Sequence, residues 1–449
     1  MNFKYIFQLL FHILLGTSIY LVNIFPRIFF FIMTTYFLGT IIITSKSQKQ
    51  AAVLKACAYI VGAEVLFRMT NGAIFYESSK YLVIVFVLIG MFYDGISNKA
   101  YPYFIFLILL VPSIVVASST IGYDSNLRTN VAFALSGPVC LGLSALYCYD
   151  KKISKRQILD TLLYLALPII SLTTYLFLYT PSLKEVITST QSNFAASGGF
   201  GPNQVSSILG LGMFVFCVQY FLNSKTLFLK ILNIVLFGLV TFRGIITFSR
   251  GGILTAVLMI FAFLFFVYFK SSQRQKYIII VSFLLLLMTS SIVWVVSSNQ
   301  TSGLIDRRYS NQDGTGKVKE DISAGRVALF IDELEGFINS PFLGVGTNGT
   351  KEARISLTGR GVVSHNELSR ILSEHGILGV MILLILVFKP LDLRLKSRNN
   401  YFFYAFLVFW FATINHSAMR IAAPGFIYAL ALLTLKNEKH PIYRKRLIK

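Results

Sequence analysis

Long apolar runs, each of about 20 residues, follow one another from end to end of this 449-residue chain. A helix needs about 20 apolar residues to cross a bilayer, because its backbone hydrogen bonds must be satisfied internally there. The pattern therefore predicts an all-α fold, a polytopic membrane protein of about 12–14 transmembrane helices. The weakest segment is 51–67, since it contains Lys55 and Glu64. The expected spans are 5–24, 27–44, 51–67, 80–95, 101–118, 131–148, 158–179, 205–222, 230–250, 252–269, 277–297, 366–388, 401–418 and 421–435.

The connections between these spans alternate in charge. Cytoplasmic loops carry an excess of lysine and arginine, so the basic face is predicted to be cytoplasmic, together with both termini. The basic connections are "SKSQKQ" (45–50), "DKKISKRQ" (150–157), "KSSQRQK" (270–276), "KPLDLRLKSRNN" (389–400) and the C-terminal tail. The opposite, extracytoplasmic face then receives the segments with the most unusual polar residues: 180–204, "SRGG" (249–252), 298–365 and "NHSAMR" (415–420).

Composition agrees with a membrane protein and narrows its partners. Only 13% of the residues are charged and the mean hydropathy is +0.68, whereas soluble proteins carry about 25% charged residues. The net charge of +22 is concentrated in short loops, so it predicts contact with membrane lipid and no nucleic-acid partner. The four cysteines lie in or beside apolar runs and are expected to be small buried side chains. The first apolar run lacks a clear cleavage site and is expected to be retained as a helix.

The chain is predicted to have three parts: a helix bundle over 1–297, a large extracytoplasmic loop with short helices over 298–365, and C-terminal helices with a basic cytoplasmic tail over 366–449. A polar connection as long as 298–365 is usually functional or disordered, and its first part is expected to be mobile. Its later part, "SAGRVALFIDELEGFINSP", predicts an amphipathic helix after Ser323 and before Pro341.

Arg326 falls in the first turn of this expected helix. A cation is unfavourable there against the helix dipole, while the free backbone N–H groups attract anions. The position therefore favours an anion site, and an exposed loop arginine without a role stays open as the alternative.

His365 and Asn366 precede an apolar run at the predicted membrane surface. Ser364 and Glu367 have the spacing of a capping box, which predicts that a helix starts there with His365 in its first turn. The positive end of a helix disfavours imidazolium and keeps the ring neutral, the form that a general base requires. An interfacial histidine without a role remains the alternative.

Arg243 and Arg250 lie seven residues apart, on about the same face of the expected ninth span. An arginine at bilayer depth costs on the order of 3 kcal/mol unless it is paired or faces water. Two on one face indicate a pocket for a polyanion, because guanidinium matches phosphate oxygens; snorkelling to the surface is the alternative for Arg250. No cluster has metal-ligand spacing, and no helix has the repeated acidic residues of a proton relay.

Four motifs, taken in order, are similar to those of the O-antigen ligase and O-antigen polymerase superfamily of bacterial inner membranes. His365-Asn366 is followed by nine residues and then Gly376-Ile-Leu-Gly379, which fits the ligase pattern throughout. The other three are "GGFGPNQ" (198–204), "SRGG" (249–252) and "AGR…FINSPFLGVGTNG" (324–349), the last departing from the family by an inserted Ser340. The resemblance covers roughly residues 198–390.

The resemblance implies a metal-independent, inverting glycosyltransferase without a cofactor, multi-pass in the bacterial inner membrane, with its active site facing the periplasm. The donor would be a glycan on undecaprenyl pyrophosphate, and the acceptor a glycan or lipid A-core. His365 would take the proton from the acceptor hydroxyl, and Asn366 would orient the ring or a sugar hydroxyl. Arg250, Arg326 and Arg243 would hold the pyrophosphate. The expected supporting residues are Ser249, Gly325, Asn203, Glu367, Gly376, Gly379, His416 and Arg420.

Several reactions fit these motifs. Ligation to lipid A-core is the main hypothesis, and polymerisation of repeat units, then transfer of glycan to protein, are the alternatives within the superfamily. A transporter of lipid-linked glycans belongs to a different class. The gathering of the polar motifs on one face argues against it.

Overall fold

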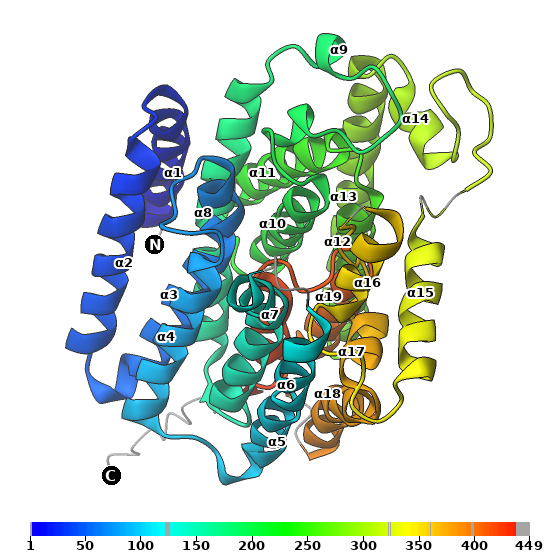
Figure 1. The fold of residues 1–449 in the computed structure, drawn as a ribbon. Helices are drawn as coiled ribbons and strands as arrows, with labels where there is room; N and C mark the ends of the chain where they lie inside the picture. Colours follow the sequence, from blue (N-terminus) through cyan, green and yellow to red (C-terminus); the bar gives the residue numbers. More distant parts are fainter. Residues whose placement is uncertain are drawn as a thin grey trace, which may run out of the picture.

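A computed structural model describes residues 2–121, 126–321, 323, 325–359, 361–396 and 399–436. The described chain is almost entirely helical (Figure 1). Its single sheet, within these ranges, is a parallel pair of two-residue strands, β1 (Lys152–Ile153) and β2 (Thr434–Leu435). The prediction of an all-α membrane protein is confirmed.

Every predicted span coincides with a helical segment. Among the described helices, ten are long and apolar enough to cross a membrane, which is fewer than the 12–14 expected. The shortfall lies in α4, α19 and α20, which are short, and in α18, which is charged in its last two turns. The helices of 17 residues or more are α1 (Asn2–Leu21), α2 (Phe25–Ile43), α3 (Lys46–Met69), α4 (Ser78–Asp94), α7 (Leu127–Cys148), α8 (Lys155–Tyr179), α10 (Pro202–Leu222), α11 (Leu227–Ile246), α12 (Arg250–Phe269), α13 (Gln273–Gln300) and α18 (Ile377–Lys396).

Shorter helices complete the bundle or cap its polar end. A span broken at Pro112 consists of η1 (Asn98–Ala100), α5 (Tyr101–Leu109) and α6 (Pro112–Thr120). The C-terminal part adds α17 (Glu367–His375), α19 (Phe403–Ile414) and α20 (Ala423–Ala431). The polar connections contain α9 (Leu183–Val186), η2 (Ala195–Ser197), α14 (Leu304–Tyr309), α15 (Arg326–Asn339) and α16 (Gly349–Thr358).

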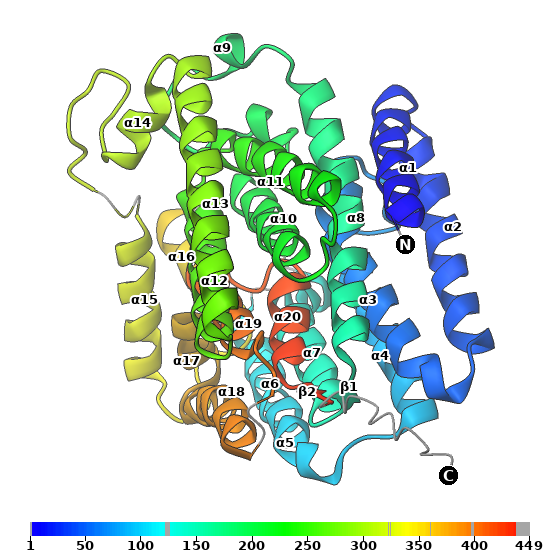
Figure 2. The same cartoon turned by 180° about the vertical axis from the view of Figure 1, so that it is seen from behind.

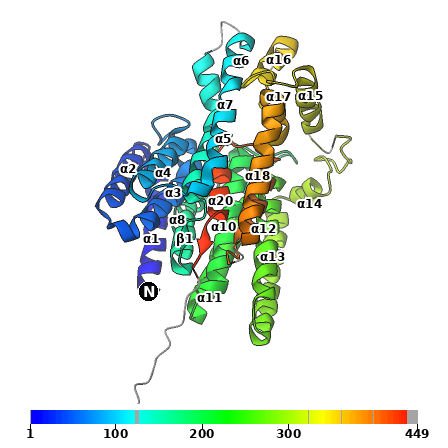
Figure 3. The same cartoon turned by 90° about the horizontal axis from the view of Figure 1, so that it is seen from below.

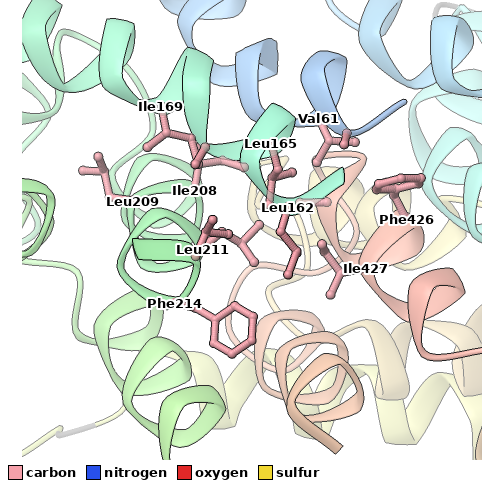
Figure 4. Close-up of a cluster of buried hydrophobic side chains, with 14 of the residues drawn as sticks. Val61, Leu162, Leu165, Ile169, Ile208, Leu209, Leu211, Phe214, Phe426 and Ile427 are labelled. Atoms are coloured by element: carbon pink, nitrogen blue, oxygen red, sulfur yellow. The ribbon is translucent and has the colours of Figure 1, made fainter. Parts of the chain in front are cut away.

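The core lies where α3, α8, α10 and α20 meet. Its side chains include Val61 of α3, Leu165 of α8, Ile208 of α10 and Phe426 of α20 (Figure 4). The weakest predicted span, α3, is thus among the most buried helices, and Glu64 inside it is paired with Arg68 at 2.7 Å. A charged residue is tolerated in that helix because the protein, and not lipid, surrounds it.

Within the described residues, the basic connections between helices come together at one end of the bundle, as the alternation of loop charge predicts. Lys49 lies 3.6 Å from the ring centre of Tyr93, and Lys151 lies 3.8 Å from that of Tyr147. The guanidinium of Arg394 contacts the Tyr404 ring beside the same end. The polar helices α15 and α16 lie with α6 at the other end, opposite the first turns of α11 and α13 (Figure 3). We refer to the two ends as the basic end and the polar end.

The amphipathic helix α15 exposes its apolar face and buries part of its polar face, the opposite of a surface helix in a soluble protein. Its apolar residues Val327, Ile331 and Ile338 are 58%, 49% and 65% exposed, whereas Glu333 is fully buried. The inner face packs on α17, where a Cβ at Gly336 would lie 2.3 Å from the Ser373 hydroxyl. An outward apolar face suits a helix at a membrane surface.

Candidate active site

Three adjoining clefts open at the polar end, and we call them together the site cleft. The first has a volume of about 440 Å³, the second about 120 Å³ and the third about 50 Å³. Arg250 and Arg308 line both the first and the second, and Arg326 lines both the second and the third. The first cleft also contains Gln191, Ser192, Asn311, Lys319 and Asp321; the second Asn203, Ser249, Gly251 and Ser323; the third Leu329, Phe330, Glu333, Ser364, His365, Asn366 and Asn415.

Arg250 reaches the cleft from the first turn of α12, not from the end of the preceding span as predicted. The helix α11 ends at Ile246, and a tight turn with Phe248 in the left-handed region (φ 58°) leads into α12. Arg250 Nη1 donates to the Asn311 side-chain oxygen and to the Arg308 carbonyl at 3.4 Å. The guanidinium is therefore held by neutral oxygens at the start of a helix.

The neighbouring serine joins two of the sequence motifs. Ser249 Oγ donates to Asn203 Oδ1 at 2.8 Å and accepts from Ser206 Oγ at 2.9 Å. Asn203 stands in the first turn of α10, which begins at Pro202. The "GPN" and "SRGG" motifs are thus one hydrogen-bonded unit in the folded chain.

The two glycines of "SRGG" permit close packing at this point. A Cβ at Gly251 would lie 2.5 Å from the His416 ring, and one at Gly252 would lie 2.3 Å from the Ser206 backbone. His416 Nε2 is 3.2 Å from Ser207 Oγ, so the ring is fixed between α10 and α12. The loop containing His416 is thereby brought against the site cleft.

Arg326 is the first residue of α15, so it lies in the first turn as the sequence predicts. The capping position is taken by Gly325, while Ser323 Oγ accepts from the Val327 N–H at 3.4 Å. Gly325 precedes the helix with φ 79°, a left-handed conformation that favours glycine. The Asp321 carboxylate accepts from the N–H groups of Gly325 (2.6 Å) and Ser323 (2.8 Å). Burial, followed by the charge of Arg250, lowers the pKa of Arg326. The "GR" motif therefore sets the geometry that brings a second cation to Arg250.

Arg308 and Lys319 were not identified from the sequence. Arg308 Nε donates to the Phe248 carbonyl at 3.1 Å, and its Nη2 donates to Ser192 Oγ at 3.3 Å. Burial and then Arg250 and Arg326 lower the pKa of Arg308. Both residues were overlooked because this stretch was expected to be mobile. In the structure it contains α14 and a turn closed by the Asp313 carboxylate.

His365 lies just before α17, and Asn366 is the residue that caps the helix. Asn366 Oδ1 accepts from the N–H groups of Leu368 (2.8 Å) and Ser369 (3.3 Å). The predicted capping box of Ser364 and Glu367 is therefore wrong, because Asn366, two residues after Ser364, takes the capping role. Asn366 Nδ2 donates to Asn415 Oδ1 at 3.1 Å, which ties the histidine motif to the loop after α19.

The prediction of a neutral His365 holds, with a different cause. The ring precedes the helix and lies at the wall of the third cleft. Burial, then the charges of Arg420 and Arg326, lowers the pKa of His365 from 6.5 to about 4. Its Nδ1 is buried and accepts no hydrogen bond from any described residue. A neutral imidazole with an uncommitted nitrogen at a cleft wall is suited to accept a proton.

Glu333 is a further cleft residue that the sequence did not single out. Its carboxylate accepts from Ser369 Oγ at 2.6 Å and from Arg354 at 3.4 Å. Burial raises the pKa of Glu333, and these partners oppose that effect. Helical spacing placed it on the polar face of α15, and nothing in the sequence indicates that this face turns inward.

The remaining residues of the histidine motif support the backbone around it. A Cβ at Gly376 (φ 60°) would lie 2.6 Å from the Pro341 carbonyl, and one at Gly379 would lie 2.3 Å from the Ile371 carbonyl. Glu367 is buried, with its carboxylate accepting from Arg370 and from the Met419 N–H at 3.1 Å. The fixed spacing from His365 to the glycines therefore reflects the packing of α17 on the loop after α15.

Two predicted arginines lie outside the cleft lining. Arg243 is buried within α11 and donates to the Ala196 carbonyl at 3.2 Å, so it holds the segment before α10. Arg420 Nη2 donates to the carbonyls of Val363 (3.1 Å) and Ser364 (2.6 Å), directly before His365. The structure assigns both to positioning the loops of the site.

Comparison with known proteins identifies one family. Residues 234–384, which contain Arg250, Arg326 and His365, match a family model described as O-antigen ligase. No curated protein matches the chain. The match supports membership of the O-antigen ligase and polymerase superfamily and confirms the resemblance predicted from the motifs. The matched part covers about a third of the chain, and it suggests a membrane enzyme of the glycosyltransferase type.

Proposed function

We propose that this chain is a glycosyltransferase that moves a glycan from undecaprenyl pyrophosphate to an acceptor hydroxyl, that of lipid A-core in the ligase reaction, at the periplasmic face of the inner membrane. The observation that carries the proposal is the continuity of the site cleft. It joins a group of cations at one end to a neutral histidine at the other.

The cationic part suits a pyrophosphate. Arg250, Arg308 and Arg326 converge there, and among the described residues none of the three forms an ion pair. A bound pyrophosphate would supply the missing negative charge through bidentate contacts with guanidinium. As the glycosidic C–O bond breaks, the same cations stabilise the charge that develops on the leaving group.

The histidine end suits the acceptor. His365 accepts the proton of the acceptor hydroxyl. The hydroxyl oxygen meanwhile forms the new bond to the anomeric carbon, on the face opposite the departing pyrophosphate. Asn366 and Asn415 are placed to hold the acceptor or the ring through side-chain amides. The outward apolar face of α15 gives the polyprenyl chain of the donor a membrane-facing approach to Arg326.

The reaction is tested with purified protein in lipid nanodiscs, supplied with an undecaprenyl-pyrophosphate glycan and lipid A-core. Formation of a glycan–lipid A-core product supports ligation. Longer undecaprenyl-linked chains without such a product would show that the reaction is polymerisation and not ligation. If neither substrate is consumed, the proposed chemistry is contradicted.

The predicted membrane orientation has its own test. All four native cysteines are buried, so single cysteines can be introduced for labelling with an impermeant thiol reagent. Val318 is 71% exposed, and Val318→Cys is expected to react from the periplasmic side. Gln273→Cys is expected to react only from the cytoplasm. The reversed labelling pattern would contradict the orientation.

A further inference from the structure

A second polar cavity lies at the basic end, far along the bundle from the site cleft. Its volume is about 450 Å³. Five cations line it against one carboxylate: Lys4, Lys55, Lys155, Arg156 and Lys225, with Asp160. Five minus one gives a net lining charge of +4. Lys55 is paired with Asp160 at 3.1 Å, and the other four form no ion pair with any described residue.

The cavity is built between helices and is more than a row of loop charges. Helix α8 lies between α1 and α11 and packs against both (Figures 1 and 2). Hydrogen bonds fix its wall, from Tyr5 to Asn233 Oδ1 at 2.6 Å and from Asn233 to Ser224 at 3.0 Å. The cations therefore surround a preformed space, with little reorganisation needed to receive an anion.

The helices that frame the cavity also present lipid-facing side chains beside it. On α1, Phe3 and Phe7 are 84% and 62% exposed, next to Lys4 and Gln8 of the lining. On α11, Leu227 is 74% exposed. An occupant with a phosphate headgroup and acyl chains would satisfy both features, since basic pockets between transmembrane helices bind anionic lipid headgroups.

We propose that this cavity is a binding site for an anionic phospholipid headgroup, with the acyl chains lying along α1 and α11. The net charge of +4 favours a headgroup with two phosphates over one with a single phosphate. The site is distinct from the donor site, because it lies at the opposite end and contains no predicted site residue. A soluble diphosphate shares the headgroup chemistry and is the competing occupant.

The test is native mass spectrometry of the purified full-length protein in neutral detergent with added cardiolipin. The wild type is expected to retain one cardiolipin, and the triple variant Lys155→Gln/Arg156→Gln/Lys225→Gln to bind at least tenfold more weakly. A matched triple variant, Lys99→Gln/Arg274→Gln/Lys276→Gln, removes the same charge at the same end but outside the cavity. It is expected to change affinity less than twofold.

A thermal melt of each variant without lipid checks folding. Lys225 is exposed between two helices, and the single substitution Lys225→Gln is expected to weaken cardiolipin binding about threefold. Equal losses in the cavity and control triples would overturn the site, as would absence of cardiolipin from the wild type. Inorganic pyrophosphate that raises the melting temperature as much as cardiolipin at equal concentration would overturn the lipid assignment. None of these outcomes depends on glycan transfer.

Discussion

Two groups of arginines lie near the polar end, and they differ in what surrounds them. Arg68 and Arg370 are each held by two carboxylates, Glu64 and Glu77 in one case and Glu367 and Glu374 in the other. Arg250 and Arg308 are instead held by backbone carbonyls and neutral side chains. Arg326 lines the same cleft beside them and, among the described residues, forms no ion pair. The first group is neutralised within the protein, and the second is left with charge for a ligand. The same residue type is therefore balanced within the protein in one place, and in our proposal it binds the donor in the other.

The largest effect is expected for His365→Ala, which removes the proposed base. General base catalysis contributes about 10²–10⁴-fold, so transfer should fall by about 10³-fold with unchanged melting temperature. His365→Gln, which keeps a polar side chain, should be equally inactive. Transfer within a few-fold of wild type in the nanodisc assay would remove the histidine from the mechanism.

Arg370→Leu tests the group of arginines that are paired with carboxylates. It leaves two buried carboxylates, Glu367 and Glu374, without their cation, and breaking a buried pair costs about 3–5 kcal/mol. A marked loss of melting temperature is expected, and any loss of activity should follow the unfolded fraction. A stable but inactive Arg370→Leu protein would show that the paired group also acts on substrate.

Arg250→Lys and Arg326→Lys test the unpaired group while keeping its charge. Lysine cannot make bidentate contacts with phosphate, so each variant should lower turnover by about 10²-fold with little change in stability. Arg307→Lys, next to Arg308 but outside the cleft lining, is the matched control and should retain activity. Wild-type turnover in both cleft variants would contradict the pyrophosphate assignment.

The smallest effect concerns pH. The pKa of His365 is lowered to about 4, so the neutral base persists as pH falls through 6.5 and is lost only near pH 4. Turnover should therefore stay constant between pH 7 and 5.5. Arg420 is the charge that lowers the pKa of His365 most. Arg420→Gln should therefore move the acidic limb of the turnover–pH profile to higher pH. A wild-type limb centred near 6.5 would mean that the group titrates as an ordinary histidine.

The helices were predictable from the sequence because apolar runs of membrane length leave few other structures possible. Ten described helices have the length and hydropathy of a span, and the difference from the 12–14 expected arises because short helices such as α19 and α20 are as apolar as the long ones. The neutrality of His365 was predicted for the wrong reason, because the flanking charges come from segments distant in sequence. Arg308 and Glu333 were missed because neither the ordering of 301–321 nor the inward polar face of α15 leaves a periodic signal.

The most direct test is the affinity for undecaprenyl pyrophosphate, measured by native mass spectrometry on wild type, Arg308→Gln and Arg307→Gln. A charge-assisted hydrogen bond to a buried group is worth about 1.5–3 kcal/mol, which corresponds to roughly 10–100-fold in affinity. Binding is predicted to weaken by that factor in Arg308→Gln and to remain at the wild-type level in Arg307→Gln. Equal affinity in all three proteins would contradict a pyrophosphate site built from the unpaired arginines.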